Sequence, residues 1–435
     1  MELYIYGGAH EVGRNCFMLH EKGKYIMLDC GVKLGEQTEY PQIPDAMGKH
    51  LHDIVVTHAH LDHSGYLPHV FKEGLKPHVH ATKPTRDLVS VLLADYARLG
   101  RGVRRGAEAF TQKDVDNAMN NFRLHEFRQP FNSGHGFKVS LLNAGHILGS
   151  AMALVEGEKR VLYTGDISVR GTKLLDGCDR NFHCDTLIIE STYGNEELPA
   201  VKETMKKLAH EIKETLKEGG HVLIPSFAVG RGQEILLLLE SYMKSGAIPE
   251  TKIYIEGMIG TGMKITRQNL GYAKEEIKNR ILMSDDDPFR SPYFHTPRRK
   301  DRDDVFEEPS IVVSTSGMLT GGPALGYVTR MAPDPKNKII FMGYQADGTR
   351  GRKILEGAKE VEIDREMVKM RMKVREIRIS GHSGKSELIQ FVKGIKGLKK
   401  VVLIHGEEDA LKSMQESLQR SYEVVVPSIG DEIKV

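Results

Sequence analysis

The sequence predicts an α/β protein in which one domain is interrupted by another, and its 435 residues favour two domains over one. Short apolar runs of strand length, each ending abruptly in polar residues, dominate residues 1–195. From about Leu198 helical and strand patterns alternate, which is typical of a parallel α/β unit with its own core. After about Lys373 strands that end in polar, histidine-bearing turns return. We therefore expect a first domain of residues 1–195 and 373–435, with residues 196–372 inserted as a second.

Polar residues in the first domain are concentrated where its expected strands end. The strands on which this rests are Leu3–Tyr6, Tyr25–Asp29, Ile54–Thr57, Val161–Thr164, Thr186–Glu190, Val374–Ser380 and Lys400–His405. Asp29, His58, Asp166 and Glu190 each lie at or just after such an end. Layered α/β folds usually carry their chemistry at these positions.

The inserted segment shows helical spacing first. Val201, Met205, Leu208, Ile212 and Leu216 recur at this spacing until Gly219 and Gly220 end the pattern. A second apolar helix is expected around Glu234–Met243, and the expected strands are His221–Phe227, Lys252–Glu256, Ser310–Ser314 and Lys338–Met342. This alternation predicts a parallel sheet covered by helices.

Composition limits the class of protein. Lys and Arg exceed Asp and Glu by 61 to 59, so nucleic-acid binding would have to rest on local basic residues. The four cysteines show no CxxC spacing, which favours buried free thiols in a reducing compartment. No apolar run approaches the roughly 18 residues that span a bilayer. The start of the chain lacks a signal-peptide pattern, so we expect a cytoplasmic protein.

The strongest local pattern is Thr57–Gly65, THAHLDHSG. A strand that ends in His-x-His-x-Asp-His places four ligand-type side chains on one tight loop, two for each of two metal ions. A two-metal site also needs a bridging carboxylate and further histidines. The chain offers His146 in NAGHILGS, Asp166 in YTGDIS and His405 in LIHGEED. The competing interpretations are a polar loop for the motif and ordinary turn residues for the others.

Two nearby features receive other interpretations. His78-Val79-His80 repeats the His-x-His spacing, but no Asp-His follows and it lies within a strand pattern, so we interpret it as structural. Asp29 in LDCG is expected to orient metal ligands rather than to bind metal itself.

The motif loop, a downstream histidine and an aspartate after a strand together resemble the metallo-β-lactamase superfamily. That resemblance implies an αββα sandwich with the metals at one edge of the sheets. Three further motifs resemble the β-CASP branch of nucleic-acid nucleases: Glu190 in ESTYGN, His382 in SGHSGKSEL and His405 in the HG turn. A histidine at the third motif implies RNA as the substrate. Residues 196–372 match the β-CASP domain of that branch.

Within the branch, three segments resemble most the nuclease subunit of the cleavage and polyadenylation specificity factor and its archaeal relatives. They are SFAVGRGQE (Ser226–Glu234), STSGMLTGGP (Ser314–Pro323) and GYQADGTRGR (Gly343–Arg352). The chain is similar to the short archaeal group without an N-terminal KH extension. This resemblance implies an endonuclease of RNA 3′-end processing, a homodimer and membership of an RNA-processing complex.

The resemblance and the chemistry of each group imply specific roles. Two zinc ions are expected, the first on His58, His60 and His146, the second on Asp62, His63 and His405, with Asp166 as the bridge. Asp62 thus also belongs to the catalytic set, in which His382 is the expected general acid and Glu190 orients it. The expected contacts to single-stranded RNA are Arg231, Ser316, Gly317, Arg350 and Arg352, for which plain turns and ordinary surface arginines are the alternatives.

Three other functions stay open. An RNase J-like 5′–3′ exoribonuclease would use the same cage of seven metal ligands. A small-molecule hydrolase of the same superfamily is disfavoured, because a small substrate does not need the second domain. A non-catalytic RNA-binding scaffold is disfavoured because every ligand position is filled.

Overall fold

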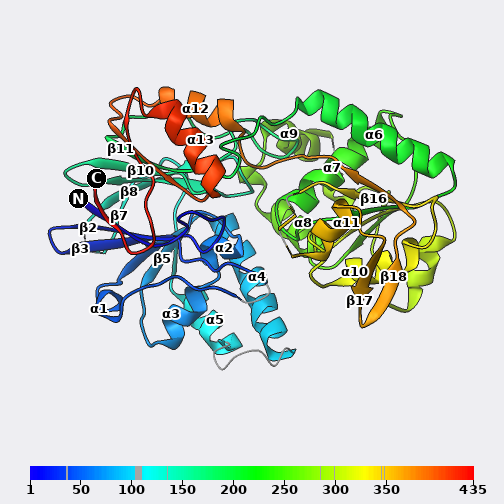
Figure 1. Cartoon of the computed structure of the whole chain (residues 1–435), viewed down its shortest axis with the longest axis horizontal. Coiled ribbons are helices and arrows are strands. Elements are labelled where there is room, and N and C mark those ends of the chain that lie inside the picture. Colours follow the sequence, from blue (N-terminus) through cyan, green and yellow to red (C-terminus); the bar gives the residue numbers. More distant parts are fainter. Residues whose placement is uncertain are drawn as a thin grey trace. The chain divides into compact units, whose positions relative to one another are not determined.

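The computed structural model describes residues 1–435 except 36–37, 103–109, 135, 285, 298, 344 and 347. The chain forms two compact units (Figure 1). The first unit comprises Met1–Gly171, Leu175–Glu197 and His382–Val435, and the second comprises Thr172–Leu174 and Leu198–Gly381. Among the described residues, no helix is both long and apolar enough to cross a membrane.

Two seven-stranded sheets form the centre of the first unit. The first sheet has the order β22 (Glu432–Lys434), β1 (Glu2–Gly7), β2 (Cys16–Glu21), β3 (Lys24–Leu28), β4 (Asp53–Val55), β5 (His78–Ala81) and β6 (Phe122–Leu124). The second has the order β21 (Glu423–Val425), β20 (Lys400–Ile404), β11 (Thr186–Glu190), β10 (Arg160–Tyr163), β9 (Ala151–Glu156), β8 (Lys138–Asn143) and β7 (Phe131–Asn132). Pairing is antiparallel from β22 to β3 and from β7 to β10, and parallel in the rest of each sheet.

The main core of this unit lies between the two sheets. Phe17 of β2 and Tyr163 of β10 meet edge to face there, with ring centroids 5.5 Å apart. Leu3 and Ile5 of β1 point into the same core, because alternate residues of a strand face the same side of the sheet. Burying each of these side chains stabilises the fold by about 1.5–3 kcal/mol.

Helices cover the outer faces of the two sheets. α12 (Lys385–Lys393) and α13 (Glu408–Leu418) pack on the second sheet, where Leu388 and Met414 join Leu187 and Leu403 in one cluster. α4 (Lys83–Gly102) packs against β6 and against α5 (Gln112–Asn120), which also contacts α3 (Leu67–Lys72). Two short helices, α1 (Asp45–Gly48) and α2 (Leu61–Ser64), lie in loops. The αββα sandwich expected from the sequence is confirmed.

The second unit is built on a parallel six-stranded sheet. Its order is β14 (Phe294–His295), β13 (Ile253–Glu256), β15 (Ile311–Ser314), β12 (Val222–Pro225), β16 (Lys338–Phe341) and β19 (Lys373–Glu376). Its helices are α6 (Val201–Lys217), α7 (Arg231–Lys244), α8 (Ile259–Gln268), α9 (Glu275–Ser284), α10 (Pro323–Met331) and α11 (Arg350–Leu355), and β17 (Glu360–Ile363) with β18 (Glu366–Lys369) forms a hairpin. Short 3₁₀ helices cover Leu270–Tyr272, Pro288–Arg290 and Arg299–Phe306.

Two expectations differ from the structure. The strand expected at Val374–Ser380 is β19, which pairs in parallel with β16, so the chain returns to the first unit at His382 and not at Lys373. Residues 83–102 form a helix in a region where only strands were expected. Val89, Leu93 and Ala97, spaced four residues apart, form its buried stripe.

Candidate metal centre

The predicted ligands lie in loops that follow strands of the first unit. The motif loop follows β4, His146 follows β8, Asp166 follows β10, and His405 follows β20. Two backbone hydrogen bonds fix the loop: Ala151 N–H donates to the carbonyl of Thr57, and Asn15 N–H donates to that of Asp62. The ligands are therefore attached to the ends of rigid strands.

Close packing under the motif loop requires glycine at one position. Two other residues near the loop have strained backbone conformations. A Cβ on Gly31 would lie 1.7 Å from the carbonyl oxygen of Asp62, so no other residue fits there. Asp29 and His405, which directly follow β3 and β20, have φ angles of 58° and 48° in the left-handed region. Such strain in non-glycine residues costs of order 1–3 kcal/mol each and is concentrated at functional sites.

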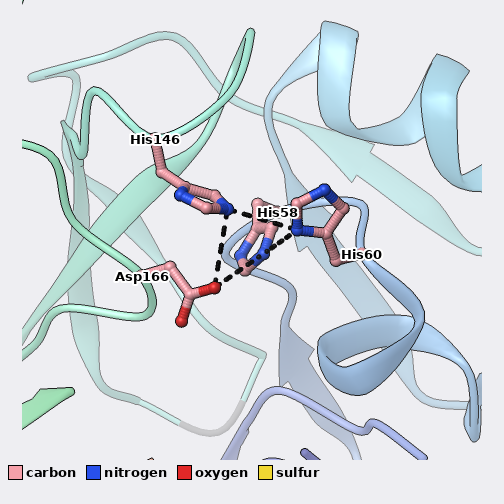
Figure 2. Close-up of side chains that lie close together, drawn as sticks. All are labelled: His58, His60, His146 and Asp166. Carbon is pink, nitrogen blue, oxygen red and sulfur yellow. Dashed lines mark hydrogen bonds and ion pairs between the residues drawn. The ribbon is translucent and has the colours of Figure 1, made fainter. Parts of the chain in front are cut away.

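The first group of donor atoms comes from His58, His60, His146 and Asp166 (Figure 2). His60 Nδ1 lies 3.2 Å from both His58 Nε2 and His146 Nε2. Asp166 Oδ2 lies 3.4 Å from His58 Nε2 and 3.5 Å from His146 Nε2. Figure 2 shows the three rings and the carboxylate converging on one point from separate segments.

The second group comes from Asp62, His63, Asp166 and His405. Asp166 Oδ1 lies 3.2 Å from His63 Nε2 and 3.6 Å from His405 Nε2. Asp62 Oδ2 lies 3.8 Å from each of the same two ring nitrogens. Asp166 therefore turns one carboxylate oxygen to each group.

The donor set fits a pair of zinc ions. Zinc bound tetrahedrally at about 2.0–2.1 Å requires ligand atoms about 3.3 Å from one another, close to the separations in the first group. Asp166 is buried, and its Oδ1 accepts no hydrogen bond from any residue that the structure describes, which leaves this atom available for a cation. Burial lowers the pKa values of His58 and His60, which keeps both rings neutral, as metal ligands must be.

A shell of hydrogen bonds holds the ligands from behind. Asp29 Oδ2 lies 2.6 Å from His63 Nδ1 and accepts hydrogen bonds from Thr57 Oγ1 at 2.8 Å and from Tyr163 Oη at 2.7 Å. This contact fixes His63 with its Nε2 toward the cage, the arrangement in which a carboxylate orients a ligating imidazole. Asp29 thus lies where an orienting residue was expected.

Asn15 also contacts the cage, and neither its role nor that of Tyr163 was anticipated. Asn15 Nδ2 lies 2.5 Å from His405 Nδ1 and 3.1 Å from His63 Nε2, while Oδ1 has no hydrogen-bond partner among the described residues. Nδ2 also donates to the Asp62 carbonyl at 3.3 Å, so one amide group contacts both the motif loop and His405. The sequence offered only a faint signal, a polar residue directly before a buried strand.

His382 and Glu190 form a pair beside the first donor group. His382 Nδ1 lies 2.9 and 3.0 Å from the two carboxylate oxygens of Glu190. Glu190 is fully buried, and its Oε1 also accepts a hydrogen bond from Ile167 N at 2.8 Å. His382 Nε2 points toward the cage, 3.9 Å from Asp166 Oδ2, and its side chain is 19% exposed. The geometry presents one polarised ring nitrogen next to the metal ligands.

The five predicted RNA contacts all lie in the second unit. Its sheet brings three glycine-bearing loops, which follow β12, β15 and β16, to the same edge. Arg231 begins α7, and Gly317 packs so closely on the first loop that a Cβ would lie 3.1 Å from Phe227 N. Ser316 Oγ accepts a hydrogen bond from Thr320 N at 3.0 Å.

The other two predicted contacts, both arginines, already bind protein groups. Arg350 Nε donates to the Glu362 carbonyl at 2.7 Å, and Arg352 Nε donates to Glu356 Oε1 at 2.6 Å. Either guanidinium would have to share or exchange these partners to contact a phosphate.

Comparisons with known proteins agree with this geometry. The family model for the metallo-beta-lactamase superfamily matches residues 11–208, the Beta-Casp domain matches 232–354, and the Zn-dependent metallo-hydrolase RNA specificity domain matches 367–427. The transcription termination factor FttA of Methanothermobacter thermautotrophicus is 36% identical over 96% of this chain and 69% of its own length. An RNase J-like protein of Methanocaldococcus jannaschii is 36% identical over 93% of this chain and 92% of its own length.

A solved structure is similar in fold. The crystal structure of a protein of unknown function from Enterococcus faecalis superimposes with a TM-score of 0.60 over 99% of both chains, at 14% identity. The fold, the three matching models and the similarity along nearly the whole chain agree. This chain belongs to the β-CASP family of metal-dependent hydrolases with the metallo-β-lactamase fold.

Proposed function

We propose that this protein is a zinc-dependent ribonuclease that hydrolyses phosphodiester bonds in single-stranded RNA. The observation that carries the proposal is the placement of Asp166, whose two carboxylate oxygens face two different histidine groups. The residues that would hold the two ions are His58, His60 and His146 for the first, Asp62, His63 and His405 for the second, and Asp166 for both.

The pair of ions, when bound, supplies a water activated for attack near neutral pH and neutralises charge on the scissile phosphate. As water adds to phosphorus, the bond to the 3′ oxygen breaks. His382 Nε2 donates a proton to that leaving oxygen, while Glu190 accepts a hydrogen bond from Nδ1–H and holds the ring in place. The products then carry a 5′-phosphate and a 3′-hydroxyl.

RNA is the proposed substrate for two reasons. The family model that matches residues 367–427 is described as an RNA specificity domain, and one relative that is 36% identical is named RNase J-like. Arg231, Ser316, Gly317, Arg350 and Arg352 are the proposed contacts to the RNA backbone.

The mode of cleavage we favour is endonucleolytic, as in RNA 3′-end processing. A 5′–3′ exoribonuclease is the second candidate, because the RNase J-like relative aligns over 92% of its own length. The two modes need the same cage and differ in whether the 5′ end of the RNA is recognised.

One digestion separates the two modes. RNA labelled at either end is prepared with a 5′-triphosphate or a 5′-monophosphate and incubated with the zinc-loaded protein and with Asp166→Asn. Internal fragments that do not depend on the 5′ group support the endonuclease, and mononucleotides released from the monophosphate alone support the exonuclease. If Asp166→Asn cleaves as fast as the unaltered protein, or if no RNA is cut, the ribonuclease proposal is wrong.

A further inference from the structure

A second cluster of metal-binding side chains lies in the first sheet, apart from the cage. Asp53 is in β4 and His78 is its partner in the neighbouring parallel strand β5. His80 lies two residues further along β5, so its side chain faces the same side of the sheet as that of His78. The same sheet therefore gathers one carboxylate and two imidazoles.

The donor atoms of this cluster are close enough to share one ion. Asp53 Oδ1 lies 2.9 Å from His80 Nε2 and 3.7 Å from His78 Nδ1, and one donor atom from each residue lies within 4.8 Å of the other two. Asp53 is fully buried and the His80 side chain is 5% exposed, whereas the His78 side chain is 46% exposed. The site thus has two buried donors and one at the surface, through which an ion can enter.

His125 orients His80 from behind. His80 Nδ1 lies 2.9 Å from His125 Nε2, and the His125 ring is stacked on Phe131 with centroids 3.5 Å apart. A hydrogen bond from His80 Nδ1–H to His125 Nε2 leaves the lone pair of His80 Nε2 for an ion, as outer hydrogen-bond partners do for other histidine ligands.

The space beside the donors is kept free of a side chain by Gly134. A Cβ at Gly134 would lie 3.6 and 3.7 Å from the two Asp53 carboxylate oxygens and 3.8 Å from His78 Nδ1. A larger side chain would occupy the volume next to Asp53 and His78, which glycine leaves without a side chain.

We propose that Asp53, His78 and His80 bind a divalent transition-metal ion of the zinc class, in addition to the ions of the cage. Two imidazoles and one carboxylate form a donor set that zinc prefers and that calcium and magnesium do not. Such an ion binds between Asp53 and the two histidines and ties β4 to β5. This proposal differs from the interpretation of His78 and His80 as structural.

The test uses the full chain loaded with cobalt as a spectroscopic substitute for zinc. The unaltered protein, His78→Ala, His78→Cys and the control His210→Ala, which alters an exposed histidine of α6, are stripped with a chelator and dialysed against Co²⁺. Bound cobalt is counted per chain and absorption spectra are recorded. We expect His78→Ala to bind one ion fewer than the unaltered protein, and His210→Ala to bind the same number.

His78→Cys provides the decisive spectrum, because a thiolate is also a zinc-class ligand. We expect it to bind as many ions as the unaltered protein and to gain a sulfur-to-cobalt charge-transfer band. Equal cobalt in the unaltered protein and His78→Ala would overturn the proposal. If His78→Ala loses several ions together with its circular dichroism spectrum, His78→Cys decides: absence of the thiolate band also overturns the proposal.

Discussion

Replacing His382 with alanine should separate proton donation from metal binding. The side chain belongs to neither zinc donor group, since its Nε2 lies 3.9 Å from Asp166 Oδ2 while Glu190 holds Nδ1 at 2.9 Å. Loss of a positioned proton donor costs on the order of 10²–10⁴-fold in rate. At 1.36 kcal/mol per factor of ten, this raises the barrier by about 2.7–5.4 kcal/mol.

The assay measures zinc per chain by elemental analysis and turnover on two substrates. In RNA the leaving 3′ oxygen is a poor leaving group, so its departure needs a proton. In bis(4-nitrophenyl) phosphate the leaving nitrophenolate is a good leaving group, so its departure needs no proton. We expect His382→Ala to retain its zinc, to lose about 10²–10⁴-fold on RNA, and to lose less than about tenfold on the activated ester. Glu190→Gln keeps the His382 ring but orients it less firmly. Its turnover on RNA should therefore lie between that of the unaltered protein and that of His382→Ala.

The competing explanation is that His382 is itself a metal ligand. This explanation has a geometric basis, because donor atoms of Asp166, Glu190 and His382 lie within 4.8 Å of one another. Loss of zinc from His382→Ala, or equal losses on both substrates, would refute the assignment as general acid. His405→Ala is the matched control, because it should lose zinc and act poorly on both substrates.

Other changes test the residues that position the metal ligands, the dependence of RNA cleavage on metal, and one ion-pair cluster of the second unit. Asp29→Asn should weaken the binding of the second ion about 10–100-fold in chelator competition, and equal loss of both ions would contradict the contact with His63. Gly31→Ala should lower both melting temperature and zinc content, since the added Cβ meets the Asp62 carbonyl at 1.7 Å; Gly260→Ala, in open space on α8, should lower neither. Dialysis against a chelator should abolish RNA cleavage and added zinc should restore it, so cleavage by the metal-free protein would exclude a metal-dependent reaction. Arg280 and Lys244 lower the pKa of Asp286 to about 2 from 3.8, so its stabilising effect is present above pH 4 and is lost as pH falls to 2. Urea unfolding should therefore find Asp286→Asn less stable than the unaltered protein at pH 5, with a smaller difference at pH 2, where the folded carboxyl is partly protonated. A difference as large at pH 2 as at pH 5 would be evidence against this.

The sequence was most informative where the chemistry is local. The motif loop places four donors within six positions, and strand-end patterns pointed to Asp166 and His405, whereas His146 was singled out as a further histidine in NAGHILGS. Asn15 could not be found this way, because its contact with His405 spans 390 positions and an asparagine before a strand is ordinary. Long-range contacts of common residue types leave no periodic signal.

The errors in the fold have physical causes as well. β19 resembles strands of the first unit because it is short and ends in polar residues, but its neighbour in space is β16. The helix at residues 83–102 was overlooked although Val89, Leu93 and Ala97 mark its buried face. A strand belongs to the sheet of the strand that it pairs with, and its own sequence does not reveal that neighbour.

The order in which the ligands occur along the chain has a consequence for biosynthesis. Ribosomes add roughly 5–20 residues per second, and the whole second unit, Leu198–Gly381, leaves the ribosome before His382 and His405. The growing polypeptide therefore lacks the proposed proton donor and one proposed zinc ligand until translation is nearly complete. A ribonuclease of the proposed kind, assembled in this order, would stay inactive beside the message that encodes it.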